Sequence, residues 1–209
     1  MGMVRGMVFG GVRARRAGSR QGFTMIELMI VIAIIGILVG MLMVALAKAK
    51  DSATRAKAKV QVKQLEKAFV AYHDEYGKWP MGMTSYDSDP KESNLTGIEL
   101  EEKCALMLAG KATDVNGVIY NAQEIPFLPH VEIKMSNDSK RGYLDPWGYC
   151  YKYMMDFNDD GELYIQFSNA SGSGDKSITL DGPEVGVWSR GPDGTDALGG
   201  DDVTSWASQ

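Results

Sequence analysis

The sequence is poor in the residues that most often build catalytic and cross-linked sites. Its 209 residues include only two histidines, His73 and His130, and two cysteines, Cys104 and Cys150. Two cysteines are too few for a disulfide framework, which leaves one bridge or two free buried thiols as alternatives. The histidines lie far apart in the chain, and neither Ser189 nor Cys150 stands in a motif that would supply a base or an oxyanion hole. We therefore expect no enzyme.

Charge of one sign is missing at each end of the chain. The first 21 residues contain no acid and five arginines (Arg5, Arg13, Arg15, Arg16, Arg20). The last 29 residues contain six acids and a single base, Arg190. After Gly22 the chain has 17 basic and 27 acidic residues, a difference of −10. A surface this acidic argues against general nucleic-acid binding.

A long, almost uncharged segment follows the basic start. Between Phe23 and Ala47 the only charged residue is Glu27, and Lys48 and Lys50 come directly after it. As a helix this segment is roughly 37 Å long, which exceeds the ~30 Å hydrocarbon layer of a bilayer. The apolar core of a secretory signal is shorter, about 7–15 residues, and ends at a small-residue cleavage site. The pattern predicts a retained membrane helix.

Glu27 is the unexpected residue of this segment. An ionised side chain near the centre of a membrane helix costs at least ~2.5–3.5 kcal/mol on insertion scales, so it needs a partner. No basic residue lies within six positions of it, and none lies in the apolar segment itself. Cleavage between Gly22 and Phe23 would create a positive amine four residues away, and a glycine offers a protease an unhindered backbone. The alternative is an ordinary membrane anchor with an incidental acid.

The helical pattern continues past the membrane segment. Residues 48 to 76 contain neither glycine nor proline, and apolar residues recur on one helical face (Leu65, Phe69, Tyr72, Tyr76). The helix should end at Gly77, before Lys78-Trp79-Pro80. The basic stretch from Lys48 to Lys67 predicts a solvated face, or one that meets lipid headgroups and acidic neighbours.

Residues 78 to 142 carry weaker signals. A short helix is expected within Gly97 to Ala109, and turn residues mark loops at Asp89-Pro90, Asn116-Gly117, Pro126 and Pro129. The length of this region predicts a long excursion over the surface.

Beyond Gly142 the pattern changes from helix to strand. The segments 149–157 and 162–167 are rich in β-favouring residues and flank Asn158-Asp159-Asp160-Gly161, which predicts a hairpin. Further strands are expected over 177–180 and 185–189. An antiparallel sheet can bury one face against the amphipathic half of the long helix. The predicted fold is α+β: a long N-terminal helix, transmembrane in its first half, packed on a small C-terminal antiparallel sheet in the shape of a lollipop.

Two segments have the composition of a calcium loop. Four acids alternate with glycines near the C-terminus (Asp193, Asp196, Asp201, Asp202), so a tight turn could present several carboxylates to one cation. The stretch "DFNDDG", 156 to 161, matches the opening of an EF-hand loop. Its completing glutamate would fall on Phe167, so a plain hairpin turn is the favoured interpretation there.

The start of the long helix carries a family resemblance. "GFTMIELMIVIAIIGILVGM" resembles the type IV prepilin signature, a basic leader ending in Gly before Phe, with Glu four residues later. The resemblance implies cleavage after Gly22 by prepilin peptidase, methylation of the Phe23 amine, and contact between Glu27 and the Phe23 amine of a neighbouring subunit. Such helices often carry proline near Val44. This one has none, and Gly36 and Gly40 are expected to supply the flexibility.

The C-terminal part carries a second resemblance. "GYLDPWGYCYKY", 142 to 153, and "WSRGPDG…GGDDVTSW", 188 to 206, resemble the major pseudopilin (protein G) of type II secretion systems, although Cys150 replaces a usual proline. The resemblance implies structural Ca²⁺ bound by Asp193, Asp201 and Asp202, with carbonyls near Trp188 and Ser189. The spacing is about one residue longer than in that family, so Asp196 is an alternative ligand.

These resemblances imply a structural filament subunit of the bacterial inner membrane. The expected parts are a cleaved leader (1–22), a transmembrane and assembly helix (23–47) and a periplasmic domain (48–209: helix 48–76, variable region 78–142, sheet and acidic loop 143–209). The expected partners are further copies, minor pseudopilins, prepilin peptidase, the bilayer, and an assembly platform with its ATPase; nucleic acid is not expected. A type IV pilin for adhesion, motility or DNA uptake is the alternative.

Overall fold

The structure is a computed structural model that describes residues 22–80, 97–157, 160–167, 176–196 and 200–206. The expected leader lies outside the described residues except for Gly22, as do the expected turn residues Asp89-Pro90 and Asn158-Asp159. The chain divides into two compact units, Met1–Ala47 and Lys48–Gln209, and each is described by itself.

The longest element is helix α1, Met25–Tyr76. In the second unit its buried residues repeat at helical spacing, and the predicted face is confirmed at Leu65, Phe69 and Tyr72. The helix ends where predicted. Gly77 adopts a positive φ of 59°, and its N–H donates to the His73 carbonyl at 2.7 Å. A left-handed residue after the last turn is the conformation that glycine adopts most easily, which explains the stop.

Four strands form the main sheet of the second unit, in the order β1-β6-β9-β10 and antiparallel throughout. They are β1 (Ile98–Glu99), β6 (Lys152–Met155), β9 (Val185–Ser189) and β10 (Val203–Thr204). Three two-stranded antiparallel sheets accompany it. They pair β2 (Thr113–Val115) with β3 (Val118–Tyr120), β4 (Ile133–Met135) with β5 (Arg141–Tyr143), and β7 (Glu162–Phe167) with β8 (Lys176–Asp181). The fold is α+β, as predicted.

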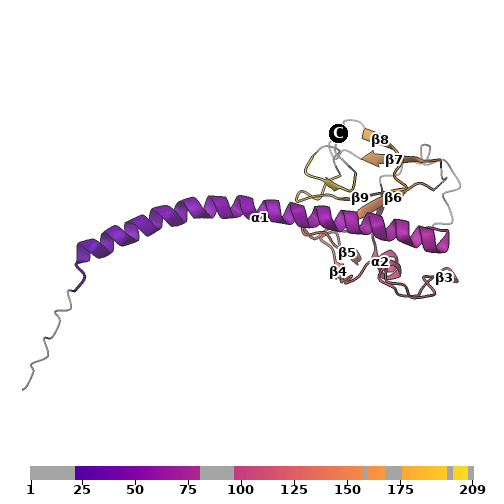
Figure 1. The fold of residues 1–209 in the computed structure, drawn as a ribbon, viewed down its shortest axis with the longest axis horizontal. Helices are drawn as coiled ribbons and strands as arrows, with labels where there is room; N and C mark the ends of the chain where they lie inside the picture. The colour runs from indigo at the N-terminus through magenta and orange to yellow at the C-terminus, as the bar shows by residue number, and fades with distance from the viewer. Residues whose placement is uncertain (1–21, 81–96, 158–159, 168–175, 197–199, 207–209) are drawn as a thin grey trace, which may run out of the picture. The chain divides into compact units, whose positions relative to one another are not determined.

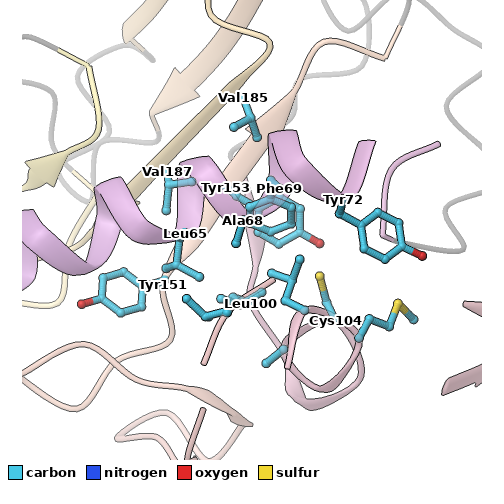
Figure 2. Close-up of a cluster of buried hydrophobic side chains, with 14 of the residues drawn as sticks. Leu65, Ala68, Phe69, Tyr72, Leu100, Cys104, Tyr151, Tyr153, Val185 and Val187 are labelled. Carbon is cyan, nitrogen blue, oxygen red and sulfur yellow. The ribbon is translucent and has the colours of Figure 1, made fainter. Parts of the chain in front are cut away.

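The core of the second unit forms around the buried face of α1. Figure 2 shows side chains from α1, β6 and β9 meeting there, together with Leu100 and Cys104. The Phe69 and Tyr153 rings lie 4.7 Å apart between centroids. In Figure 1, β6–β9 are drawn above this part of α1, and β3–β5 with helix α2 (Glu102–Leu108) below it. A smaller cluster around Trp188 joins β7 to β9. The second unit thus has a core of its own.

The predicted hairpin between 149–157 and 162–167 is wrong. Strand β6 is shorter than expected, and it pairs with β1 on one edge and with β9 on the other. All four of its residues are buried. A central strand has no free edge, so β7 pairs instead with β8 over the six residues from Glu162 to Phe167. The loop between β6 and β7 therefore joins two different sheets.

The expectation that 78–142 is a surface excursion is also wrong for much of its described part. Helix α2 forms within the predicted range, and it buries Cys104, Ala105, Met107 and Leu108 in the core. It starts later than predicted because Ile98–Glu99 pair with β6 instead. The Asn-Gly turn at 116–117 makes the tight β2–β3 hairpin, with φ of 55° and 83°.

Candidate functional site

The N-terminus of α1 forms a reciprocal cap between Thr24 and Glu27. The Thr24 amide and hydroxyl both donate to Glu27 Oε2 at 2.8 Å, and the Glu27 amide donates to Thr24 Oγ1 at 3.3 Å. This is a capping box, in which each side chain satisfies a backbone N–H that the helix leaves unpaired. Glu27 also places a negative charge in the first helical turn, where the helix dipole favours it.

The capping box gives Glu27 a role within a single chain. The sequence analysis weighed a partner amine against an incidental acid and did not predict this cap, although the spacing Ser/Thr-x-x-Glu ahead of an apolar run is itself a helix-start signal. Phe23 precedes the cap and is 83% exposed. Gly22 and Phe23 thus lie immediately outside a defined helix end, and both are exposed.

The helix beyond this cap has no covering element in the described structure. Every residue from Gly22 to Ala53 is exposed, including the large apolar side chains of the first unit. Among the described residues, α1 is the one helix long and apolar enough to cross a membrane. A helix that is apolar on all sides normally lies in lipid or inside a larger assembly. The arrangement fits a membrane-anchored subunit.

The described carboxylates of the acidic C-terminal loop lie in two different environments, one buried and one exposed to solvent. Asp196 is buried and makes an ion pair with the buried Lys152. Its second oxygen accepts a hydrogen bond from Trp188 Nε1 at 3.1 Å. Asp196 therefore anchors the loop to β6 and β9, and both of its oxygens already have partners.

Asp193 and Asp201 come together on the outer side of the same loop. The Asp193 amide donates to Asp201 Oδ2 at 3.3 Å, and Asp193 Oδ1 accepts from the Thr195 amide at 2.8 Å. Arg55 Nη1 donates to the Asp201 carbonyl at 3.1 Å, which ties the loop to α1. Residues 197–199 lie outside the described residues. No group of three His, Cys, Asp or Glu side chains close enough to hold a metal occurs in the described part of the chain.

Ser189 joins the acidic loop to the Asp145 turn. Its hydroxyl donates to Asp145 Oδ2 at 2.6 Å and accepts from the Gly191 amide at 3.1 Å. The Trp147 and Tyr149 amides both donate to Asp145 Oδ1 at 2.9 Å. Burial raises the pKa of Asp145, although these hydrogen bonds oppose the shift. The Asp-Pro-Trp-Gly turn and the final loop thus form one hydrogen-bonded structure.

His73 and the two cysteines, three of the residues considered for catalysis, are packed against other side chains or buried, whereas His130 is exposed. His73 stacks on Trp79 at 4.1 Å between ring centroids. Cys104 and Cys150 are both buried and free, which decides between the two alternatives left open by the sequence. Burial raises the pKa of Cys104 to about 12 and of Cys150 to about 11. Both thiols therefore stay protonated and are poor nucleophiles at neutral pH.

Comparisons with known proteins match the helix start. The family model of the prokaryotic N-terminal methylation motif matches residues 18–43. Two Type IV major pilin proteins PilE1 of Neisseria gonorrhoeae are each 38% identical to this chain over 86 residues, or 40% of its length. The chain spans about half the length of these curated relatives, 50% and 46%. No solved structure matches the chain.

Proposed function

Because the chain is a type IV pilin-like protein, we propose that it is a structural subunit that polymerises through its N-terminal helix. More specifically, we propose that the polymer is a type II secretion pseudopilus, which drives protein export. The observation that carries the proposal is the methylation motif at the start of helix α1, where Glu27 in the first turn is the one charge of the apolar segment 23–47. An acid with no other charge nearby in a membrane helix calls for a cationic partner, and a neighbouring subunit can supply one.

The proposed assembly step exchanges one set of donors for another. In the single chain the amide and hydroxyl of Thr24 hold the Glu27 carboxylate. Cleavage after Gly22 frees the Phe23 amine, and methylation leaves it positively charged. When helices stack, the amine of one subunit lies against Glu27 of the next. An ion pair between two full charges in lipid is stronger than the hydrogen bonds that the carboxylate accepts from the neutral donors of Thr24, so assembly is favoured.

The proposed location follows from the same helix. Residues 23–47 store the subunit in the bacterial inner membrane, with the leader in the cytoplasm and the domain from Lys48 onward in the periplasm. Prepilin peptidase processes the chain, an assembly platform and its ATPase supply the energy, and minor pseudopilins complete the filament. The subunit itself performs no catalysis in this proposal, consistent with two buried, protonated thiols.

A surface type IV pilin for adhesion, motility or DNA uptake is the second candidate. It is favoured by the relatives, which are major pilins. The pseudopilin is favoured by the joined structure of the Asp145 turn and the final loop. Shear release of filaments from the cell surface would support the pilin, and a secretion defect without surface filaments would support the pseudopilin. DNA binding that weakens steeply with salt would support uptake.

Calcium in the acidic loop belongs to the same proposal. Asp193 and Asp201 are the candidate ligands because the Asp193 amide donates to the Asp201 carboxylate across the loop, and Asp202 follows in sequence. Asp196 fits poorly because Lys152 already balances its charge. Bound Ca²⁺ would neutralise the clustered carboxylates and fix the loop on β9. We expect Ca²⁺ to raise the melting temperature of the full-length protein, and Asp201→Asn to reduce the rise. A melt unaffected by EDTA would refute the calcium part alone.

N-terminal mass spectrometry of the protein from bacterial membranes tests the proposed function. Processing predicts a chain that begins at methylated Phe23. A Gly22→Trp variant, which blocks access to the cleavage position, should retain Met1 and fail to assemble. A wild-type chain that retains Met1 in the membrane would overturn the proposal.

A further inference from the structure

One face of helix α1 carries a row of positive charges at a spacing of about one helical turn. The row consists of Arg55, Lys59, Lys63 and Lys67, and its three lysines are exposed. Asp51 pairs with Arg55 at 3.2 Å, and Glu66 pairs with Lys63 at 2.8 Å, so the row keeps a net positive charge. Like charges four residues apart are neighbours on a helix and destabilise it. The row therefore costs the single chain some stability.

A groove of about 590 Å³ lies beside this row, between α1 and strand β10. Arg55, Lys59 and Lys63 line it from the helix, and β10 lines it together with Trp206. Arg55 Nη1 donates to the Asp201 carbonyl at 3.1 Å, which ties the helix to the strand side. The Trp206 ring packs edge-on against the buried Trp188 ring, at 5.8 Å between centroids. The groove thus has fixed walls and an excess of positive charge.

The row also contains an apolar residue that a merely solvated basic face does not need. Val60 is 57% exposed, and it lies with Lys59, Lys63 and Lys67 in a hollow of about 320 Å³ next to the groove. Apolar side chains and cations side by side are typical of a surface that contacts another protein.

The opposite arrangement of charge occurs at one end of the β7–β8 ladder. Glu162 and Asp181 stand directly opposite each other there, and both are exposed. Glu184 follows in the same segment, and the sequence from 177 to 189 contains no basic residue. Like charges at opposite positions of a ladder destabilise it. This acidic pair, like the basic row, would therefore gain from a partner of opposite charge.

The two surfaces match in spacing as well as in sign. Lysines four residues apart on a helix have Cβ atoms about 5–6 Å apart. Residues opposite each other in an antiparallel ladder have Cβ atoms about 4.5–5.5 Å apart. Glu162 and Asp181 can therefore each face one lysine of the pair Lys59 and Lys63. In the described part of the chain, β7 and β8 pack on the Trp188 cluster, to which α1 contributes no residue.

We propose that the groove beside the basic row binds the Glu162 and Asp181 end of the β7–β8 sheet of a second copy of this chain. A second copy is the favoured partner because the chain after Gly22 has 17 basic and 27 acidic residues, and because the acidic pair fits the lysine spacing. The contact joins two different surfaces, and repeated contacts of this kind build an open filament when they do not close a ring. The inference rests on the proposed filament function and adds a contact between the domains to that between the helix starts.

The test variant is Lys59→Glu, which reverses one charge on the groove wall. It replaces the like-charged pair with Lys63 by a pair of opposite charge, so the helix should remain folded. We expect the amount of filament pelleted from cells that express it to fall about tenfold or more, since like charges across an interface oppose association. Lys57→Glu is the matched control. It makes the same change at an exposed position outside the groove and should assemble normally.

Asp181→Lys supplies the reciprocal change. It gives Glu162 an oppositely charged neighbour in the ladder, so the fold should not suffer, but it places a positive charge against the basic row. We expect it to reduce filaments as Lys59→Glu does. The double variant with Lys59→Glu and Asp181→Lys restores attraction with the signs exchanged, and it should recover most of the wild-type amount. Denaturant unfolding of each full-length variant in detergent checks that the domain is folded.

Loss of filaments in both single variants and their recovery in the double variant would support the contact. The contact is contradicted if Lys59→Glu assembles like wild type, if Lys57→Glu loses as much, or if the double variant does not recover. Unchanged filaments together with weaker binding of Lys59→Glu to vesicles of anionic phospholipid would assign the groove to lipid and also contradict it.

The wild-type chain separates this inference from the proposed function. Wild-type filaments with a processed Phe23 leave the proposed function standing, whatever the groove variants do. A wild-type chain that is inserted and processed but forms no filament would contradict both.

Discussion

The two halves of helix α1, up to Ala47 and from Lys48 onward, both carry apolar side chains, but these side chains are covered in different ways. From Lys48 onward the helix buries a stripe that meets α2, β6 and β9. Up to Ala47 it is apolar on all sides and wholly exposed in the described structure. The second half finds its partners within the chain, whereas the first half requires lipid or other subunits. The folding stability of the domain therefore depends on the second half, and the proposed assembly depends on the first.

The largest expected effect comes from comparing one substitution in each half of the helix by its change in the free energy of unfolding. Phe69→Ala removes a fully buried ring that packs on Tyr153. We expect a loss of ~3–5 kcal/mol in the free energy of unfolding, as for other large-to-small core changes. Ile37→Ala, at a 61% exposed position, should change it by no more than ~0.5 kcal/mol. Denaturant unfolding of the full chain in detergent measures both. Equal losses would show that the first half also packs within the chain.

Glycine substitutions sharpen the same contrast. A methyl group at Gly97, where φ is 76°, would overlap the Trp188 ring. We expect Gly97→Ala to destabilise the protein by about 1–3 kcal/mol through overpacking, with backbone strain in addition. A methyl group at Gly36 meets nothing within 4 Å. Gly36→Ala should strengthen the helix by up to ~1 kcal/mol. Melting temperatures that move in the same direction would contradict this account.

The smallest expected effect is on the stability of the protein at acidic pH. Burial alone would raise the pKa of Asp138, but hydrogen bonds from Ser136 and Arg190 hold it below its ordinary 3.8. A depressed pKa adds stability at neutral pH that is lost as the pH falls below 3.8 toward the folded-state value. Asp138→Asn should therefore flatten the acid limb of stability as the pH falls below 3.8. Unfolding midpoints of the wild type and the variant, measured across that range, test the difference.

Local signals predicted the elements, and long-range contacts decided their partners. The stop at Gly77 and the extents of β7 and β9 were predicted correctly because turn residues and side-chain alternation lie within each segment. The pairing of β6 with β1 joins residues more than fifty positions apart. The side-chain pattern of β6 did not indicate which strands would pair with its two edges.

The sites divide in the same way. The capping box of Thr24 and Glu27 could have been predicted from the four-residue spacing of the two side chains. It was not predicted because a partner amine already accounted for an acid at this position. The sequence could not show that Asp196 is set apart from Asp193. Asp196 is held by an ion pair with Lys152, which lies 44 positions away in the chain. A row of acids in sequence does not reveal which one a distant lysine will neutralise.

We propose that the charge of Glu27, and not its capping role, drives assembly. Glutamine also serves at this position of a capping box, so Glu27→Gln keeps the helix start and removes the charge. Thr24→Ala does the reverse and is the matched control. Filaments pelleted from cells that express each variant give the measurement. We expect Glu27→Gln to insert into the membrane and to be cleaved but to form no filament, whereas Thr24→Ala should assemble. Wild-type amounts of filament from Glu27→Gln would contradict it.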